Sequence, residues 1–235
     1  MSRFIAPVCQ SCPSRRGPLF GCCPLEELEF LAASKSSQRY QKGQIIYQEG
    51  AQALGLYCVH QGKIKVFKTG SDYKEQIVRL VRHGDVMGVR ALVTGSRYSN
   101  SAVALEDCVV CVVPRPDFLR LVQSNPQFST SLMQLLASAL GEAEERMLQL
   151  AYKPVRERLA GALLLLQRTF GEEPNPAQFS ISLSREDVAS LVGTAKETVS
   201  RLLSEFKDAG IVMTKGSQIT ILDLARLHDI ATFYD

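Results

Sequence analysis

The sequence has no long run of hydrophobic residues. Its longest apolar run, LAGALLLL at 159–166, ends at Gln167 and Arg168. A helix that crosses a bilayer needs roughly 20 such residues. The opening residues, MSRFIAPVCQSC, also lack the apolar stretch of a signal peptide. We therefore expect no membrane partner and a cytoplasmic location, where disulfides rarely persist.

Histidine is scarce and the charges nearly balance. The three histidines, His60, His83 and His228, stand isolated in the sequence. No phosphate-binding loop is present, and no Ser/His/Asp arrangement can be inferred, so we do not expect an enzyme. A net charge of +3 over 235 residues gives no bulk argument for nucleic acid. A nucleic-acid function must therefore come from a motif.

Short strands are predicted from Gln41 to about Pro114. The runs QIIYQEG, LYCVHQGKIKVFK, QIVRLV and SAVALEDCVVCVV are alternating or β-branched, and glycines separate them. This pattern is typical of an all-β sandwich or roll built from hairpins. We expect a short amphipathic helix before it, over 24–40, and another around 115–122.

A long helix is predicted from Asn125-Pro126, with proline near the first helical position. Its apolar residues are spaced 4-3-4-3, at Leu136, Leu140, Ala143, Met147 and Leu150. That narrow seam favours packing against an identical helix, and a single helix facing its own core is the alternative. Lys153-Pro154 ends or kinks the helix. A second helix over 155–170 and a loop over 171–178 are expected to follow.

The segment SLSREDVASLVGTAKETVSRLLSEF, residues 182–206, predicts two short helices. Ser184 is expected to cap the first, Gly193 to end it, and Thr194 to cap the second. A tight turn containing glycine between two helices makes a helix-turn-helix, whose second helix enters the major groove. Residues 209–223, AGIVMTKGSQITILD, look like a two-stranded wing around Lys215-Gly216.

The exposed face at the start of that second helix carries Lys196, Glu197, Ser200 and Arg201. Arg pairs with guanine, Glu accepts a hydrogen bond from cytosine, and Ser contacts a base or a phosphate. The i, i+4 spacing puts Glu197 and Arg201 on one face. The alternative is a solvated helix face with an ordinary ion pair.

The order of these parts resembles the Crp/Fnr family of bacterial transcription regulators. The segments QKGQIIYQEG, QGKIKVF, HGDVMG and EDVASLVGTAKETVSRLLSEF carry most of the resemblance. It implies an α+β fold with an N-terminal β-roll like a cyclic-nucleotide-binding domain, a long dimerisation helix and a C-terminal winged helix-turn-helix. The expected domains are a cysteine-rich arm at 1–23, the β-roll sensor at 24–123, the dimerisation helix at 124–152 and the DNA-binding domain at 153–235.

The resemblance also implies partners and a set of DNA contacts. A homodimer would read a two-fold symmetric site in double-stranded DNA and act with RNA polymerase. Glu197 and Arg201 match the family's base readers, and Ser200 matches the oxygen-sensing branch. Lys196 matches neither branch, which leaves the outer bases of the half-site open. The expected DNA-binding residues are Ser184, Thr194, Lys196, Glu197, Ser200 and Arg201.

Four of the seven cysteines lie in CQSCPSRRGPLFGCC, residues 9–23. The oxygen-sensing branch, that of the fumarate and nitrate reduction regulator, has Cys-x2-Cys-x5-Cys near its N-terminus and a fourth cysteine on the roll. By this match the ligands of a [4Fe–4S] cluster are Cys9, Cys12, Cys22 and Cys111. Cys111 is matched by its position before Pro114. The chain is then a transcription regulator that responds to oxygen or redox state.

The match leaves alternatives open. Nine residues separate the second and third ligands here, rather than five, although a longer loop costs little to close. Cys23 is an alternative third ligand and Cys108 an alternative fourth. On strand alternation, Cys108 and Cys111 lie on opposite faces, so only one can face the arm. Cys58 is expected to be a buried small hydrophobe.

Other signals remain possible for the same fold. A zinc ion accepts the same four thiolates, and a thiol redox switch needs no metal. A cyclic nucleotide would bind at Gly84-Asp85 and Asn100-Ser101, where the family's phosphate-binding Arg is missing and Asn100 cannot replace it. The haem-binding branch has a histidine where this chain has Arg90, so haem stays an alternative cofactor only in a different pocket, between the roll and the long helix. A thiol redox enzyme and a regulatory module without DNA contact are the functions from other classes.

Overall fold

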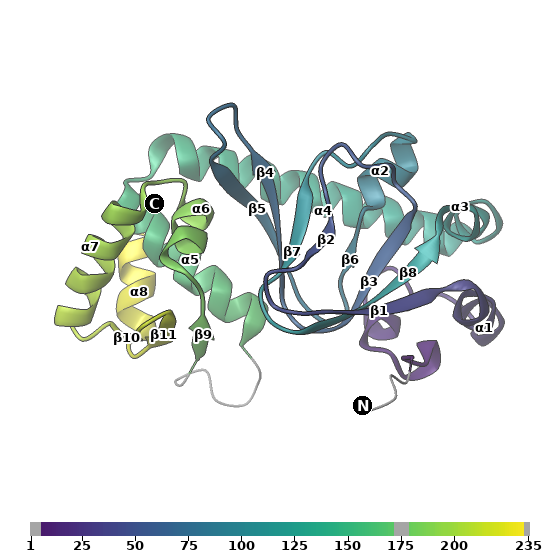
Figure 1. Ribbon diagram of the computed structural model, residues 1–235, viewed down its shortest axis with the longest axis horizontal. Helices are drawn as coiled ribbons and strands as arrows, with labels where there is room; N and C mark the ends of the chain where they lie inside the picture. Colours follow the sequence, from purple (N-terminus) through teal and green to yellow (C-terminus); the bar gives the residue numbers. More distant parts are fainter. Residues whose placement is uncertain (1–5, 172–178, 233–235) are drawn as a thin grey trace. The chain divides into compact units, whose positions relative to one another are not determined.

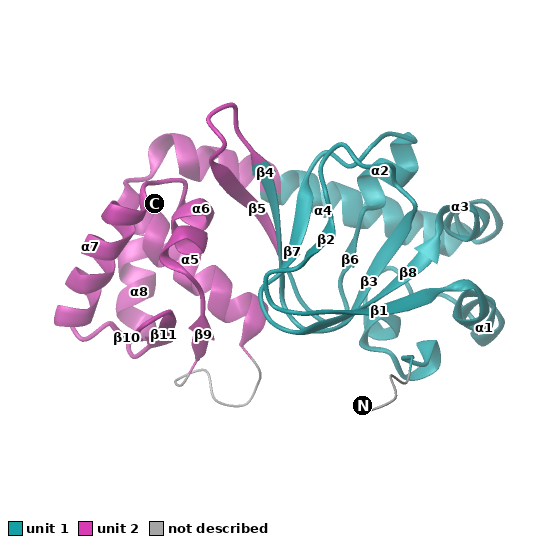
Figure 2. Cartoon of the chain, viewed as in Figure 1, with its two compact units in different colours: residues 1–68, 81–142 teal, residues 69–80, 143–235 magenta. Residues whose placement is uncertain are grey.

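The computed structural model describes residues 6–171 and 179–232. The predicted loop at 171–178 therefore lies, apart from Gly171, outside the described residues. The chain divides into two compact units, which Figure 2 colours separately. The first unit comprises residues 1–68 and 81–142, and the second comprises residues 69–80 and 143–235.

The predicted β-roll is present as two four-stranded sheets (Figure 1). The first sheet has the order β1-β8-β3-β6, with β1 Ser36–Tyr40, β8 Cys108–Pro114, β3 Gly55–Gln61 and β6 Val86–Met87. The second has the order β2-β7-β4-β5, with β2 Ile45–Tyr47, β7 Ser101–Ala104, β4 Ile64–Thr69 and β5 Glu75–Val81.

Apolar side chains from both sheets fill the roll. Val59 of β3, Ile64 of β4 and Val110 of β8 have no exposed surface. Burying a Val or Ile side chain contributes roughly 1.5–3 kcal/mol, so these positions hold the sheets together. The turn between β3 and β4 requires glycine, because Gly62 has φ +103° and a Cβ there would lie 2.4 Å from the Cys108 sulfur.

The helix predicted over 24–40 is shorter than expected. Helix α1 spans Leu25–Ser34, and the following residues form strand β1, paired antiparallel with β8. The prediction was wrong beyond Ser34 because Ser36–Tyr40 pair with β8, whose backbone groups on that side would lose these partners if the helix continued. Leu28 and Leu31 of α1 are buried, whereas Leu25 is 52% exposed.

The remaining helices of this unit are α2, Val89–Thr94, and α3, Arg115–Ser124, close to the predicted range. The predicted long helix is present as α4, Pro126–Tyr152. Asn125 caps it: the side-chain oxygen accepts a hydrogen bond from the Phe128 amide at 3.0 Å. The side-chain nitrogen of Asn125, Nδ2, also donates to the Glu27 carboxylate at 2.8 Å, which ties the start of α4 to α1.

The N-terminal arm consists of two 3-10 helices, η1 at Cys9–Ser11 and η2 at Pro13–Arg16. Leu19 and Phe20 follow η2 and are almost fully buried in the core of the first unit. The Phe20 ring lies 5.8 Å from that of Phe128 in α4. Two buried apolar side chains thus anchor the arm. Figure 1 shows the arm, in purple, beside the roll.

The second unit contains the predicted winged helix-turn-helix. Its elements are α5 Val155–Phe170, β9 Ser180–Ser182, α6 Arg185–Val192, α7 Lys196–Asp208, β10 Val212–Lys215, β11 Gln218–Ile221 and α8 Leu224–Ala231. The three strands form one sheet in the order β10-β11-β9. Together the two units confirm the predicted α+β fold. Among the described residues, no helix has the length and apolar character needed to cross a membrane.

The caps of the two motif helices differ from each other. Ser184 caps α6 as predicted, because its hydroxyl accepts a hydrogen bond from the Asp187 amide at 2.9 Å. Gly193 ends α6 with φ +72°. The expected cap at Thr194 was wrong: Ala195 precedes α7 and gives no side-chain cap. Thr194 still belongs to the end of α6, since its amide donates to the Ala189 carbonyl.

Candidate thiol cavity and nucleic-acid interface

Two cysteines of the arm face the roll. Cys9 begins η1 and Cys12 follows that helix, and the Cys12 amide donates to the Cys9 carbonyl at 3.3 Å. Side chains three residues apart in a 3-10 turn eclipse one another, so both sulfurs point the same way. Cys12 is 9% exposed, and Cys9 is half-buried.

Two cysteines of the roll face the arm. Cys58 in β3 and Cys111 in β8 are direct partners in the antiparallel register. Residues opposite each other in such a pair project from the same face of the sheet. Cys108 projects from the other face, where its sulfur lies 3.1 Å from the Glu106 carbonyl oxygen. The expectation that only one of the two β8 cysteines faces the arm is confirmed.

The arm and roll thiols meet at one cavity of about 30 Å³. It is bounded by elements of the first unit alone. The lining residues are Cys9, Cys12, Ser14, Arg15, Phe20, Leu28, Leu31, Lys35, Cys58, Cys111 and Val113. The cavity therefore brings together three of the four predicted cluster ligands and adds Cys58.

The other two arm cysteines do not line this cavity. The Cys22 thiol donates to the Leu19 carbonyl at 3.4 Å and lies 3.9 Å from the Ser131 hydroxyl of α4. Cys23 is buried, and burial together with Cys22 and Glu27 raises its thiol pKa. Cys22, the predicted third ligand, and Cys23, its alternative, therefore both lie outside the cavity that the other thiols line.

One cation lies among the cavity thiols. The Lys35 ammonium donates to the Pro7 carbonyl and lies 3.8 Å from the Cys111 sulfur. Burial raises the pKa of Cys9, and the Lys35 charge acts in the opposite direction. Burial raises the pKa of Cys58 well above that of a free thiol, and the neighbouring thiols add to the rise.

Two polar side chains contact the sulfurs directly. The Ser37 hydroxyl lies 3.2 Å from the Cys111 sulfur, and His60 Nδ1 lies 3.4 Å from the Cys12 sulfur. Burial lowers the pKa of His60, which favours the neutral imidazole. His60 is thus not isolated as the sequence suggested, because β3 carries it to the arm.

The expected DNA-reading side chains lie at the start of α7. Lys196, Glu197 and Arg201 are exposed and Ser200 is half-buried. Lys196 forms an ion pair with Glu186 of α6. Arg201 pairs with Glu205 at 2.5 Å, one turn further along the helix, although the sequence suggested Glu197 as its neighbour. The charged groups thus lie on the exposed face of the helix. Both ion pairs are open to solvent, so water can take the place of either partner.

The positions that match a cyclic-nucleotide pocket make internal hydrogen bonds. The Asn100 side-chain oxygen accepts from the Tyr47 hydroxyl at 3.1 Å. The Ser101 hydroxyl accepts from the Glu49 amide at 3.0 Å and is 6% exposed. The Tyr47 ring also stacks on Tyr98, with centroids 4.4 Å apart. These groups are thus engaged with the roll itself.

Comparisons with known proteins match both parts of the chain. Residues 37–125 match the cyclic nucleotide-binding domain family and residues 157–230 the Crp-like helix-turn-helix domain family. The chain is 33% identical over 192 residues to the fumarate and nitrate reduction regulatory protein of Vibrio cholerae, which covers 81% of this chain and 76% of that protein.

Two further relatives cover more of the chain or have a known structure. The cyclic AMP receptor protein of Thermus thermophilus is 31% identical over 214 residues, 91% of this chain and 96% of that protein. The structure of FixK2 from Bradyrhizobium japonicum aligns with a TM-score of 0.74 at 31% identity, over 83% of this chain and 96% of that one. On its fold, its helix-turn-helix and these relatives, the chain belongs to the Crp/Fnr family of DNA-binding transcription regulators, whose members are not enzymes.

Proposed function

We propose that this regulator acts as a homodimer that responds to oxygen or redox state through a [4Fe–4S] cluster. The observation that carries the proposal is the cavity where thiols of the arm and thiols of the roll meet. Thiolates are the protein ligands of iron–sulfur clusters, and four of them line this cavity. The similarity to a fumarate and nitrate reduction regulatory protein supports the same reading.

Four thiols line the cavity, and thiolates are the donors that such a cluster takes. Among residues 6–171 and 179–232, no group of three or more His, Cys, Asp or Glu side chains is placed to hold a metal ion. The arm and roll thiols would therefore have to move relative to one another to hold a cluster. When bound, it would supply an oxygen-labile link between the arm and the roll. Lys35 and Arg15, which also line the cavity, would offset part of its negative charge.

The arm can pass such a movement to the long helix. Phe20 packs on Phe128 of α4, and the Ser131 hydroxyl contacts the Cys22 sulfur. Both α4 residues lie in its first two turns. A shift of the arm therefore changes the packing at the start of α4, which is the element we assign to the dimer.

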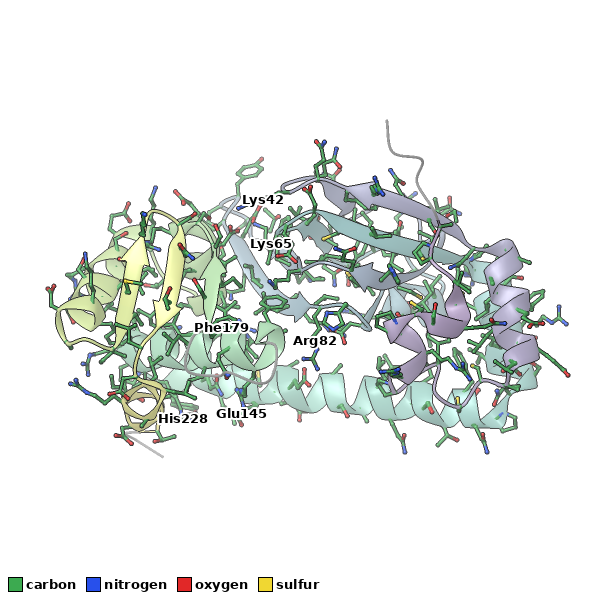
Figure 3. The ribbon with its side chains drawn as sticks, turned by 90° about the horizontal axis from the view of Figure 1, so that it is seen from below. Lys42, Lys65, Arg82, Glu145, Phe179 and His228 are labelled. Atoms are coloured by element: carbon green, nitrogen blue, oxygen red, sulfur yellow. The ribbon has the colours of Figure 1, made fainter. Side chains whose placement is uncertain are left out.

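The seam of α4 supports a dimer. Only Phe128 and Leu132 are buried in this helix, whereas Leu140 is 61% and Met147 63% exposed. Leu140 and Met147, together with Met133, occupy the a positions of a heptad repeat. The d positions are Leu136, Ala143 and Leu150. Figure 3 shows this helix with Glu145 labelled on it. Glu142, Glu144 and Glu145 lie beside the seam, where like charges keep the pairing weak and switchable.

In the dimer, two α7 helices would read the two halves of a symmetric DNA site. Arg201, Glu197 and Ser200 would contact base edges and Lys196 the outer bases. Ser184 lies at the start of α6, and Thr194 lies in the turn before α7. Both would contact phosphate near a helix N-terminus, where backbone amides favour it. RNA polymerase is the remaining partner that the family suggests. The internal hydrogen bonds of Asn100 and Ser101 argue against a cyclic nucleotide as the effector.

The test begins with protein purified without air. Iron and acid-labile sulfide are counted per chain, and absorbance is recorded. About four irons per chain supports the proposal. A colourless protein with one zinc, or a sharp red haem band, overturns the iron–sulfur part.

The second measurement is DNA affinity, using a duplex selected from a random library by the anaerobic protein. Affinity and sedimentation are followed as air is admitted. We expect weaker binding and a shift from dimer to monomer. Equal affinities before and after loss of the iron would rule out the switch and leave only the DNA-binding regulator.

A further inference from the structure

We propose that Cys58 is the fourth cluster ligand, together with Cys9, Cys12 and Cys111, and that Cys22 is not a ligand. This assignment rests on the proposed function, because it names the residues that hold the same cluster. It differs from the set that sequence resemblance implies, which takes its third ligand from the arm.

The sheet fixes Cys58 next to Cys111. The two residues are direct partners in the antiparallel pairing of β3 and β8, so their Cα atoms are about 4.5–5.5 Å apart. Both side chains line the cavity that Cys9 and Cys12 face. β8 lies between β1 and β3 in the first sheet, so this pair sits within the sheet and not at its edge. Two ligands would then come from the rigid sheet and two from the arm.

Cys22 is held elsewhere by the same arm. Leu19 and Phe20, which precede it, are 2% and 5% exposed and belong to the core of the first unit. The Cys22 thiol donates to the Leu19 carbonyl, and the Ser131 hydroxyl of α4 contacts its sulfur. Phe20 lines the cavity, but Cys22, two residues further on, does not. Bringing Cys22 to the other thiols would break its contacts with Leu19 and Ser131, whereas Cys58 already lines the cavity.

The test compares serine variants of the full-length chain, each reconstituted without air with ferrous iron and sulfide. The variants are Cys58→Ser, Cys111→Ser, Cys22→Ser and Cys108→Ser. Cys108 is the matched control, because it is as buried as Cys58 but projects from the opposite face of β8. Iron, sulfide and the visible spectrum are measured for each variant, and circular dichroism of the iron-free forms checks the fold.

We expect Cys58→Ser and Cys111→Ser to hold less than about one iron per chain, against about four in the unmodified protein. Cys22→Ser and Cys108→Ser should keep the full load. A full load in Cys58→Ser, or its loss in Cys22→Ser alone, overturns the assignment. If the unmodified chain takes up no iron, the proposed function itself fails and the assignment fails with it.

A measurement on the unmodified protein avoids any loss of folding in a variant. Cys9 and Cys22 are both half-buried, so both can be alkylated in the iron-free chain. Iron loading should protect Cys9 from alkylation and leave the rate at Cys22 unchanged, as peptide mass spectrometry would show. Protection of Cys22 to the same degree as Cys9 contradicts the assignment, whatever the variants do.

Discussion

The outward-facing residues of the helix-turn-helix come from one stretch of chain, whereas the cavity thiols come from three separate segments. Ser184, Gly193 and Arg201 take their positions from helix periodicity and the turn between the helices. Cys12, Cys58 and Cys111 meet only because the roll pairs β3 with β8 and the arm folds over them. A site built locally should tolerate distant changes that a site built from several segments does not.

The largest expected effect is the loss of stability when a buried phenylalanine is removed from the core of one unit. The same change in the other unit is the comparison. Phe128 has no exposed surface and packs against Phe20 and Phe118 in the first unit. Phe128→Ala should lower the free energy of unfolding by about 3–5 kcal/mol, because it leaves a cavity. Denaturant titration measures this loss. The variant should also hold iron poorly, since the anchor of the arm is weakened.

The matched control is Phe206→Ala. Phe206 of α7 is equally buried, in the second unit, and its loss should destabilise by a similar amount. It should weaken DNA binding while the iron content stays at the level of the unmodified chain. A full iron load in Phe128→Ala would show that iron binding does not depend on the packing of the arm against α4. The milder Phe128→Leu serves if the alanine variant does not fold.

Arg201 gives the next largest effect, this time confined to DNA. Arg201→Ala should weaken binding to the selected duplex by about 1–3 kcal/mol, because a bidentate contact to guanine is lost. Iron content should be unchanged. Glu205→Gln is the control: it releases Arg201 from its ion pair but keeps the guanidinium, so affinity should hold or improve. Unchanged affinity in Arg201→Ala would favour a regulatory module that does not read DNA through this helix.

A smaller effect concerns the caps of the same motif. Ser184→Ala should destabilise the second unit by about 1 kcal/mol, since the hydroxyl satisfies the Asp187 amide. Thr194→Ala should change stability much less, because α7 has no side-chain cap. Thermal unfolding of the two variants side by side measures the difference. Equal losses would mean that Thr194 caps α7 in solution.

The same contrast explains what could be predicted from the sequence. Helix α4, the roll strands and the wing follow from periodicity, glycines and β-branched runs, and their expected positions are confirmed. The end of α1 could not be predicted, because Ser36–Tyr40 is a strand only through its pairing with β8. Cys58 was missed for the same reason. The strand LYCVHQG was predicted, but no neighbouring residue in the sequence indicates that Cys58 lies opposite Cys111 in the sheet.

The smallest expected effect tests the charge inside the cavity. Burial raises the pKa of Cys9 and Lys35 opposes that rise, so Lys35→Met should raise the pKa of Cys9 further. In iron-free protein at a pH below that pKa, less Cys9 is then thiolate, and its alkylation should slow. Because the folded-state pKa exceeds the unfolded one, this group stabilises the fold at low pH and loses that contribution as the pH rises through the folded pKa. The alkaline loss of stability should therefore be larger and extend to higher pH in Lys35→Met, although it begins at the same unfolded-state pKa in both proteins. Lys42→Met, at an exposed lysine of the first unit, is the control and should leave both measurements unchanged. An unaltered Cys9 rate in Lys35→Met would show that Lys35 does not act on the thiols.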